Sequence, residues 1–123
     1  MTQNPLEISF LLMMLFQIFH IFEEVGCGAH NIAGGLKKYL IVASTLVTLN
    51  FTAFGLILYD NKWGYILGIF TSLVLAVGNG VIHSIGWIKT RTNRDSLGAG
   101  VFTGIPLALL GVWVFFQILP NLN

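Results

Sequence analysis

Four apolar stretches, each long enough to cross a lipid bilayer as a helix, constrain this chain of 123 residues more than any other feature. A helix needs about 20 residues to span the roughly 30 Å of hydrocarbon in a bilayer. Hydrophobic residues make up 55% of the chain and charged residues only 9%, whereas soluble domains carry about a quarter charged residues. We therefore predict an all-α, polytopic membrane protein with one domain, a bundle of four transmembrane helices. The predicted helices cover residues 6–26, 38–59, 64–89 and 98–119.

The basic residues predict the orientation of these helices, because Lys and Arg collect in cytoplasmic loops. Five of the six lie at the ends of the first and third stretches, and the opposite side has only Lys62. We expect these two loops to be cytoplasmic and both termini to lie outside. Topology and contact with anionic membrane lipid explain the five basic residues, and nothing in the sequence indicates nucleic-acid binding. They are Lys37, Lys38, Lys89, Arg91 and Arg94.

The first stretch contains His20, Glu23 and Glu24, although ionisable groups near lipid are costly and usually functional. Both carboxylates share a helix face with His20, because residues three and four apart are neighbours on a helix. The C-terminal end of a helix disfavours each carboxylate by about 0.3–1 kcal/mol, and adjacent acids also repel each other. A cation or a shared proton near the two carboxylates would remove both conflicts.

A second polar pair, Asn79 and His83, lies in the third stretch at a matching depth. His83 precedes Lys89 by six residues, as His20 precedes Gly26, and the two helices run in the same direction. At 1.5 Å per residue both histidines lie about 9 Å from the helix ends. Asn79 is one turn before His83 and shares its face. We expect His20 and His83 to face each other in one polar cavity near the cytoplasmic side.

Further polar and aromatic residues accompany these groups. Gln17 precedes His20 by one turn and Trp87 follows His83 by one turn, so both are candidate positioning or substrate-binding residues, together with Asn79 and Thr48. Threonines in membrane helices often bond to their own backbone, and this is the expected role of most of them. Aromatic residues at the helix ends, Trp87 among them, fit interfacial belts. We expect a solvated loop histidine at position 30 and an ordinary thiol at position 27. The threonines are Thr45, Thr48, Thr52 and Thr103, and the belt residues are Tyr39, Tyr59, Trp63, Tyr65 and Trp87.

The motifs His-x-x-Glu-Glu and Asn-x-x-x-His, at the spacing found here, resemble those of the HXXEE family of small bacterial membrane proteins. The likeness covers most of the chain and continues through an Arg to a Thr that starts the last helix. Alanine stands where the family tends to have proline, in the pair Ala99-Gly100. The resemblance implies a shared polar site in a protein of the bacterial inner membrane. It names no reaction, since no activity is established for the family. The residues that carry it are His20, Glu23, Glu24, Asn79, His83, Arg94, Gly100 and Thr103.

A membrane-embedded metal site is the interpretation we favour. Histidines combined with carboxylates suit Zn, Fe or Mn rather than Ca or Mg. A single ion is expected, because di-iron bundles usually use four carboxylates and Glu7 lies at the other end of its helix. Such a site supports hydrolysis or oxidation of a lipophilic substrate. The expected ligands are His20, Glu23, Glu24 and His83, of which His20, Glu23 and Glu24 would also be catalytic.

Two other functions fit the same residues. In the first, a metal-free enzyme isomerises or cyclises a sterol-like or isoprenoid substrate, with a protonated Glu as the acid and His20 or the other Glu as the base. In the second, the chain binds or transports a hydrophobic ligand as a non-catalytic subunit. Transport would require a homo-oligomer, because four helices are few for a transporter protomer.

Overall fold

The structure, a computed structural model, describes residues 4–122 and consists of helices joined by short connections. The prediction of four membrane-length helices is confirmed. The first span is α1 (Pro5–Gly26), the second is α3 (Leu36–Leu58) and the last is α6 (Val101–Ile118). The third span joins α4 (Lys62–Phe70), the π-helical segment η1 (Thr71–Val77) and α5 (Gly78–Thr90). Two short helices complete the chain, α2 (Ala29–Ile32) after α1 and the 3-10 helix η2 (Leu119–Leu122) at the end.

The observed and expected helices differ most at the start of α6. The expected helix begins at residue 98, whereas α6 begins at Val101, because Gly100 adopts a left-handed conformation (φ 92°) as its N-cap. Such a φ is accessible to glycine without steric cost. This turn places Gly100 and the first turn of α6 directly against the end of α1 that carries the polar motif.

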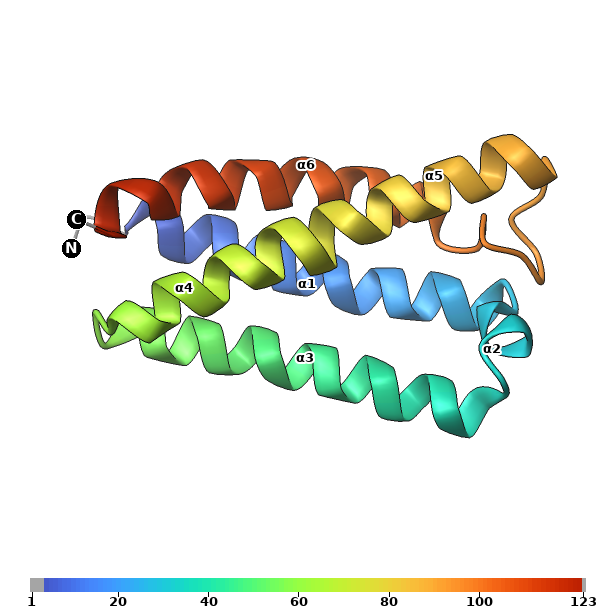
Figure 1. Cartoon of the computed structure of the whole chain (residues 1–123), viewed down its shortest axis with the longest axis horizontal. Helices are drawn as coiled ribbons and strands as arrows, with labels where there is room; N and C mark the ends of the chain where they lie inside the picture. Colours follow the sequence, from blue (N-terminus) through green and yellow to red (C-terminus); the bar gives the residue numbers. More distant parts are fainter. Residues whose placement is uncertain (1–3, 123) are drawn as a thin grey trace.

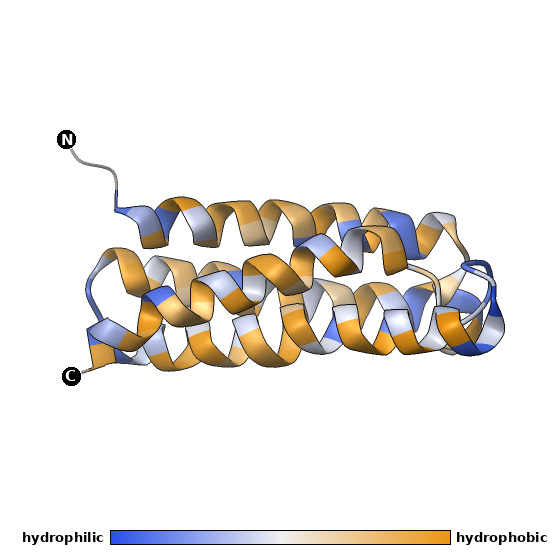
Figure 2. Cartoon of the chain, turned by 90° about the horizontal axis from the view of Figure 1, so that it is seen from above, coloured by the Kyte–Doolittle hydropathy of each residue, from blue (hydrophilic) through white to orange (hydrophobic). Residues whose placement is uncertain are grey.

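The four spans fit an integral membrane protein. The first three are 22, 23 and 29 residues long, and the last, counted from the start of α6 through η2, is 22; each is apolar over a membrane-length window. The helices are mostly orange in Figure 2, whereas the connections at both ends are blue. The first and last described residues lie at the same end of the bundle (Figure 1), as an even number of spans requires.

The third span crosses the bundle obliquely and so determines which helices meet at each end. α4 packs against α3, whereas α5 packs against α6, and α1 lies between α3 and α6 (Figure 1). Within residues 4–122, the backbones of α3 and α5 do not approach each other closely. The two helices therefore diverge from the α3–α4 turn toward the end of the bundle that carries the basic loops.

Close packing holds α1, α6 and the third span together. In lipid this packing matters more than hydrophobicity, because lipid tails are as apolar as the side chains. Large side chains fill the centre, and small residues allow close approach elsewhere: a Cβ on Gly80 would lie 2.4 Å from the carbonyl oxygen of Gly104. α5 and α6 thus meet backbone to backbone one turn before His83. The fully buried apolar side chains include Phe10, Met13, Leu107, Val114 and Ile118.

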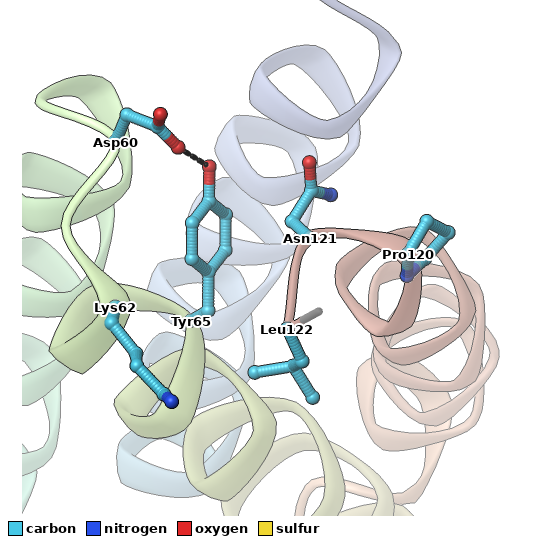
Figure 3. Close-up of a pocket in the computed structure, with 6 residues that line it drawn as sticks. All are labelled: Asp60, Lys62, Tyr65, Pro120, Asn121 and Leu122. Carbon is cyan, nitrogen blue, oxygen red and sulfur yellow. Dashed lines mark hydrogen bonds between the residues drawn. The ribbon is translucent and has the colours of Figure 1, made fainter.

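At the opposite end of the bundle, Tyr65 bonds to the turn between α3 and α4. Its hydroxyl donates to Asp60 Oδ1 at 2.6 Å (Figure 3). Tyr65 is only 6% exposed, so the expectation that it belongs to an interfacial belt is wrong. Asn61 caps α4 by accepting from the backbone N–H of Trp63 at 2.9 Å. A surface hollow of about 440 Å³ lies beside this turn, against the end of η2. None of the residues predicted for the functional site lines it.

Candidate metal centre

Three side chains that can bind a metal converge where α1 meets α5. One nitrogen or oxygen atom each from His20, Glu24 and His83 lies within 4.8 Å of the other two. His83 Nε2 is 3.1 Å from Glu24 Oε1, and His20 Nε2 is 3.7 Å from Glu24 Oε2. The two imidazole centroids are 4.9 Å apart. The histidines therefore lie against each other, as their equal depth in the sequence predicted.

The surrounding helices bring this group together. His20 and Glu24 share a face of α1 because they are four residues apart. His83 reaches them because α5 approaches α6 closely at Gly80. The π-helical segment η1 precedes α5, and each residue that a π-helix inserts rotates the helix beyond it. Gly100 completes the fit, because a Cβ there would lie 2.6 Å from His20 Cε1.

The hydrogen bonds of His20 fix its tautomer. Its Nδ1 is 3.1 Å from Thr103 Oγ1, and the Thr103 hydroxyl donates to Glu23 Oε2 at 2.5 Å. Since that hydroxyl proton is already used, Thr103 can only accept from a protonated Nδ1 of His20. His20 Nε2 then carries the lone pair, and it is buried without a hydrogen-bond partner. An unpartnered buried acceptor is costly, and a bound cation would remove this cost.

His83 is held in the same way. Its Nδ1 is 2.8 Å from the backbone carbonyl of Leu97, which can only accept a proton. Both imidazoles thus use Nδ1–H for an outer partner and direct Nε2 toward the carboxylate of Glu24. Metal-binding histidines commonly donate their second N–H to a carbonyl or another acceptor in this way. The arrangement therefore has the hydrogen bonding expected around a metal ligand set.

Glu23, the neighbour of Glu24, faces α6 instead. Its Oε1 accepts from the backbone N–H of Phe102 at 3.1 Å, and its Oε2 accepts from that of Thr103 at 2.7 Å. The first N–H groups of a helix lack partners within the helix, and the positive end of the helix dipole favours an anion there. The conflict expected from two carboxylates at the end of α1 is thus resolved for Glu23 by α6. Glu23 lies outside the group formed by His20, Glu24 and His83.

Tyr39 of α3 is a site residue that the sequence reasoning assigned to an interfacial belt. Its hydroxyl donates to Glu24 Oε2 at 2.6 Å, and its side chain is only 9% exposed. The belt assignment is therefore wrong for Tyr39, while Tyr59, Trp63 and Trp87 are 40% or more exposed. Glu24 lies near the end of α1 and Tyr39 near the start of α3, so the two residues have a similar depth in the sequence. Tyr39 could have been predicted from this depth, as the pairing of the histidines was.

A small cavity lies beside Glu24, between α1, α3 and α5. Its volume is about 150 Å³, and Glu24, Gln17, Tyr39 and Asn79 supply its polar groups. Gln17 is only 4% exposed, so its carboxamide is held within the bundle. The structure thus brings Gln17 and Asn79 to the cavity next to the three-residue group, in keeping with a positioning or substrate-binding role.

Other candidates lie away from the group. Thr48 is exposed on α3 and donates to the carbonyl of Ser44 at 2.8 Å, and Thr45 and Thr52 bond to their own helix in the same manner. Trp87 is 40% exposed on the outer face of α5, which suits an anchor at the membrane interface. Thr103 departs from the backbone bonding expected of most of the threonines, because it joins Glu23 to His20.

The connection between α1 and α3 adds no ligand to the group. His30 is half-buried and lies outside it. Burial, and then the nearby Glu23, raise the pKa of the Cys27 thiol, which keeps it in the unreactive protonated form. The backbone carbonyl of Cys27 instead accepts from the N–H of Asp95 at 2.8 Å, which fastens the 91–100 loop over the end of α1.

The hydrogen bond from His20 to Thr103 yields a testable expectation. We expect Thr103→Val to weaken metal binding by about 10–100-fold, the usual effect of losing a partner of a ligating histidine. Thr103→Ser keeps the hydroxyl and is expected to bind metal nearly as well as the wild type. Competition with a fluorescent zinc chelator in detergent would measure both affinities. Equal affinities for the Val and Ser variants would show that Thr103 does not orient His20.

Comparisons with protein-family models, with curated proteins and with solved structures found no match to this chain. A helical bundle by itself is compatible with many functions, so only the chemistry of the site can indicate the function.

Proposed function

We propose that this chain is a membrane-embedded metal-dependent enzyme that acts on a lipophilic substrate, with His20, Glu24 and His83 as ligands of a single Zn, Fe or Mn ion. The observation that carries the proposal is the direction of the two imidazoles. Both use Nδ1–H for outer partners, and both turn Nε2 toward one carboxylate. The group also unites residues that carry the resemblance to the HXXEE family, so membership of that family is part of the proposal.

The distances suit such an ion. Bonds of about 2.0–2.1 Å in a tetrahedral site separate neighbouring ligand atoms by about 3.3 Å, and the observed separations from Glu24 are 3.1 and 3.7 Å. Two imidazole nitrogens and a carboxylate favour Zn, Fe or Mn over Ca or Mg. Three protein ligands leave a further position for water or substrate, which is typical of catalytic rather than structural sites.

The ion would supply a Lewis acid and acidify a bound water. The residues of the chain orient and protect that chemistry. His20 is completely buried, so bulk water is kept from this side of the site, and Tyr39 holds the Glu24 carboxylate in place. Gln17 and Asn79 face the adjacent cavity, where their carboxamides can orient a substrate. If the basic loops are cytoplasmic, the site lies in the cytoplasmic half of the membrane.

Metal analysis tests the proposal directly. We expect protein purified in detergent without chelator to carry about one Zn, Fe or Mn ion per chain, and His20→Ala to carry less than about a tenth of that. Thr48→Val, on the lipid-facing side of α3, is the matched control and should keep the metal. Elemental analysis by mass spectrometry gives the ratio. A wild-type protein without stoichiometric metal would overturn the proposal.

A metal-free acid–base enzyme is the second candidate, favoured by the two groups that bond to Glu24. Tyr39 and His83 lie 2.6 and 3.1 Å from its carboxylate oxygens, so a proton can pass between Glu24 and His83 beside the cavity. If this function is correct, metal-free wild-type protein should convert a lipid that co-purifies with it. The Glu24→Gln variant should lose this conversion. Unaltered turnover in that variant would exclude it, and binding without turnover would indicate a non-catalytic subunit.

A further inference from the structure

The cavity beside Glu24 is lined by both polar and aliphatic side chains. Polar groups come from α1, α3 and α5, as described above, and the remaining lining side chains are aliphatic. One of these, Val42, is 58% exposed on α3, so the cavity reaches the surface that faces hydrocarbon. This is also the region where α3 and α5 diverge (Figure 1). The aliphatic lining residues are Ile21, Val42, Ala43 and Leu46.

The size and charge of the cavity restrict what it can hold. The cavity volume of about 150 Å³ is room for several water molecules. It therefore accommodates a small head group and leaves a hydrocarbon tail outside. The lining contains no Lys or Arg, so no basic side chain of the cavity can pair with an anionic head. The carboxamides of Gln17 and Asn79 can both donate and accept hydrogen bonds, which suits a neutral polar group.

We propose that a single-chain neutral lipid enters this cavity sideways from the bilayer, with a hydroxyl or carbonyl head beside Glu24 and its alkyl tail in the lipid between α3 and α5. The inference rests on the proposed function, because Glu24 is both a metal ligand and a wall of the cavity. It adds the chemical class of the substrate and its route of entry. The cavity supplies no basic side chain that would pair with an anionic phosphate head.

Photo-crosslinking in phosphatidylcholine nanodiscs tests this inference. The probe is hexadecanol with a diazirine next to the hydroxyl-bearing carbon, and the matched anionic probe is hexadecyl phosphate with the diazirine at the same position. We expect the alcohol to label the cavity residues of α1, α3 and α5 about tenfold more than the phosphate does, as the desolvation cost of a charged head implies. Excess unlabelled hexadecanol should suppress this labelling.

Two neighbouring residues of α3 provide a matched pair of variants. Ala43 is 7% exposed and lines the cavity, whereas Ser44 is exposed on the outer face. Ala43→Phe fills the cavity and should reduce labelling by the alcohol about tenfold, whereas Ser44→Phe adds the same ring outside and should not. Asn79→Leu replaces a polar side chain of the cavity lining with an apolar one of similar volume. It provides a second test of labelling by the alcohol if Ala43→Phe fails to fold.

Metal content, measured on the same samples, separates this inference from the metal proposal. Cavity labelling in a protein without metal would support lipid entry and overturn the metal. A metal-loaded protein labelled evenly over the lipid-facing residues, or equally by both probes, would overturn lipid entry alone. Labelling that Ala43→Phe and Asn79→Leu leave unchanged would likewise overturn it.

Discussion

Glu24→Gln is expected to lower the affinity for metal by at least about 100-fold, because it removes the one anionic ligand of the proposed site. Glu24 is the residue that lies between the two histidines, at 3.1 Å from His83 Nε2 and 3.7 Å from His20 Nε2. A glutamine of the same shape keeps the hydrogen bond from Tyr39, so the fold should be retained. Metal content after purification and chelator competition would measure the loss.

Glu23→Gln is the matched control, since the two carboxylates are adjacent in sequence. The Glu23 carboxylate accepts from the backbone N–H groups of Phe102 and Thr103. Removing its charge therefore weakens the stabilisation of the N-terminal end of α6. We expect retained metal and a destabilisation of about 1 kcal/mol, the size of a charge–dipole contribution at a helix end. Equal loss of metal in both variants would show that both carboxylates bind the ion, as the sequence alone predicted.

Gly80→Ala is expected to destabilise the protein by about 2–3 kcal/mol, because the added methyl group overpacks a backbone contact. Its Cβ would lie 2.4 Å from the Gly104 carbonyl oxygen and 2.6 Å from Ala108 Cβ. Helix α5 would have to move away from α6 and carry His83 with it, so metal binding should weaken as well. Unfolding by sodium dodecyl sulfate in mixed micelles, followed by circular dichroism, would measure the change.

Gly78→Ala is the control two residues earlier. A Cβ there meets only the carbonyl oxygen of Leu73, at an ordinary 3.8 Å. Because alanine is a better helix former than glycine by about 1 kcal/mol, this variant should be at least as stable as the wild type. If Gly80→Ala matched it in stability and metal content, close approach of α5 and α6 would not be needed for the site.

Part of the site follows from the sequence through simple geometry. The distance of His20 and His83 from the ends of helices that run in the same direction placed both at one depth, and their rings do meet. The same reasoning treated Glu23 and Glu24 alike, because both lie one turn beyond His20. Only the position of the first turn of α6 separates them, and that turn belongs to a segment nearly 80 residues away.

The direction in which a side chain points around its helix axis was harder to predict than its depth along the helix. Thr48 and Trp87 have suitable depths or spacings, yet they face lipid. Tyr39 was expected to lie in an interfacial belt, yet it bonds to Glu24. Thr103 bonds to His20, although most of the threonines were expected to bond to their own backbone. A sequence alternates faces at a regular period only while the helix is regular, and the π-helical segment η1 interrupts that period before Asn79 and His83.

The sequence by itself determined the class of the protein. The length and hydropathy of four segments fit membrane-spanning helices, because lipid leaves every backbone polar group to be paired within the segment. Tertiary structure decided the chemistry of the polar residues. The partner of each buried group depends on helix rotation and on contacts between distant segments. These contacts turn His20, Glu24 and His83 toward one point and assign Glu23 to the end of α6.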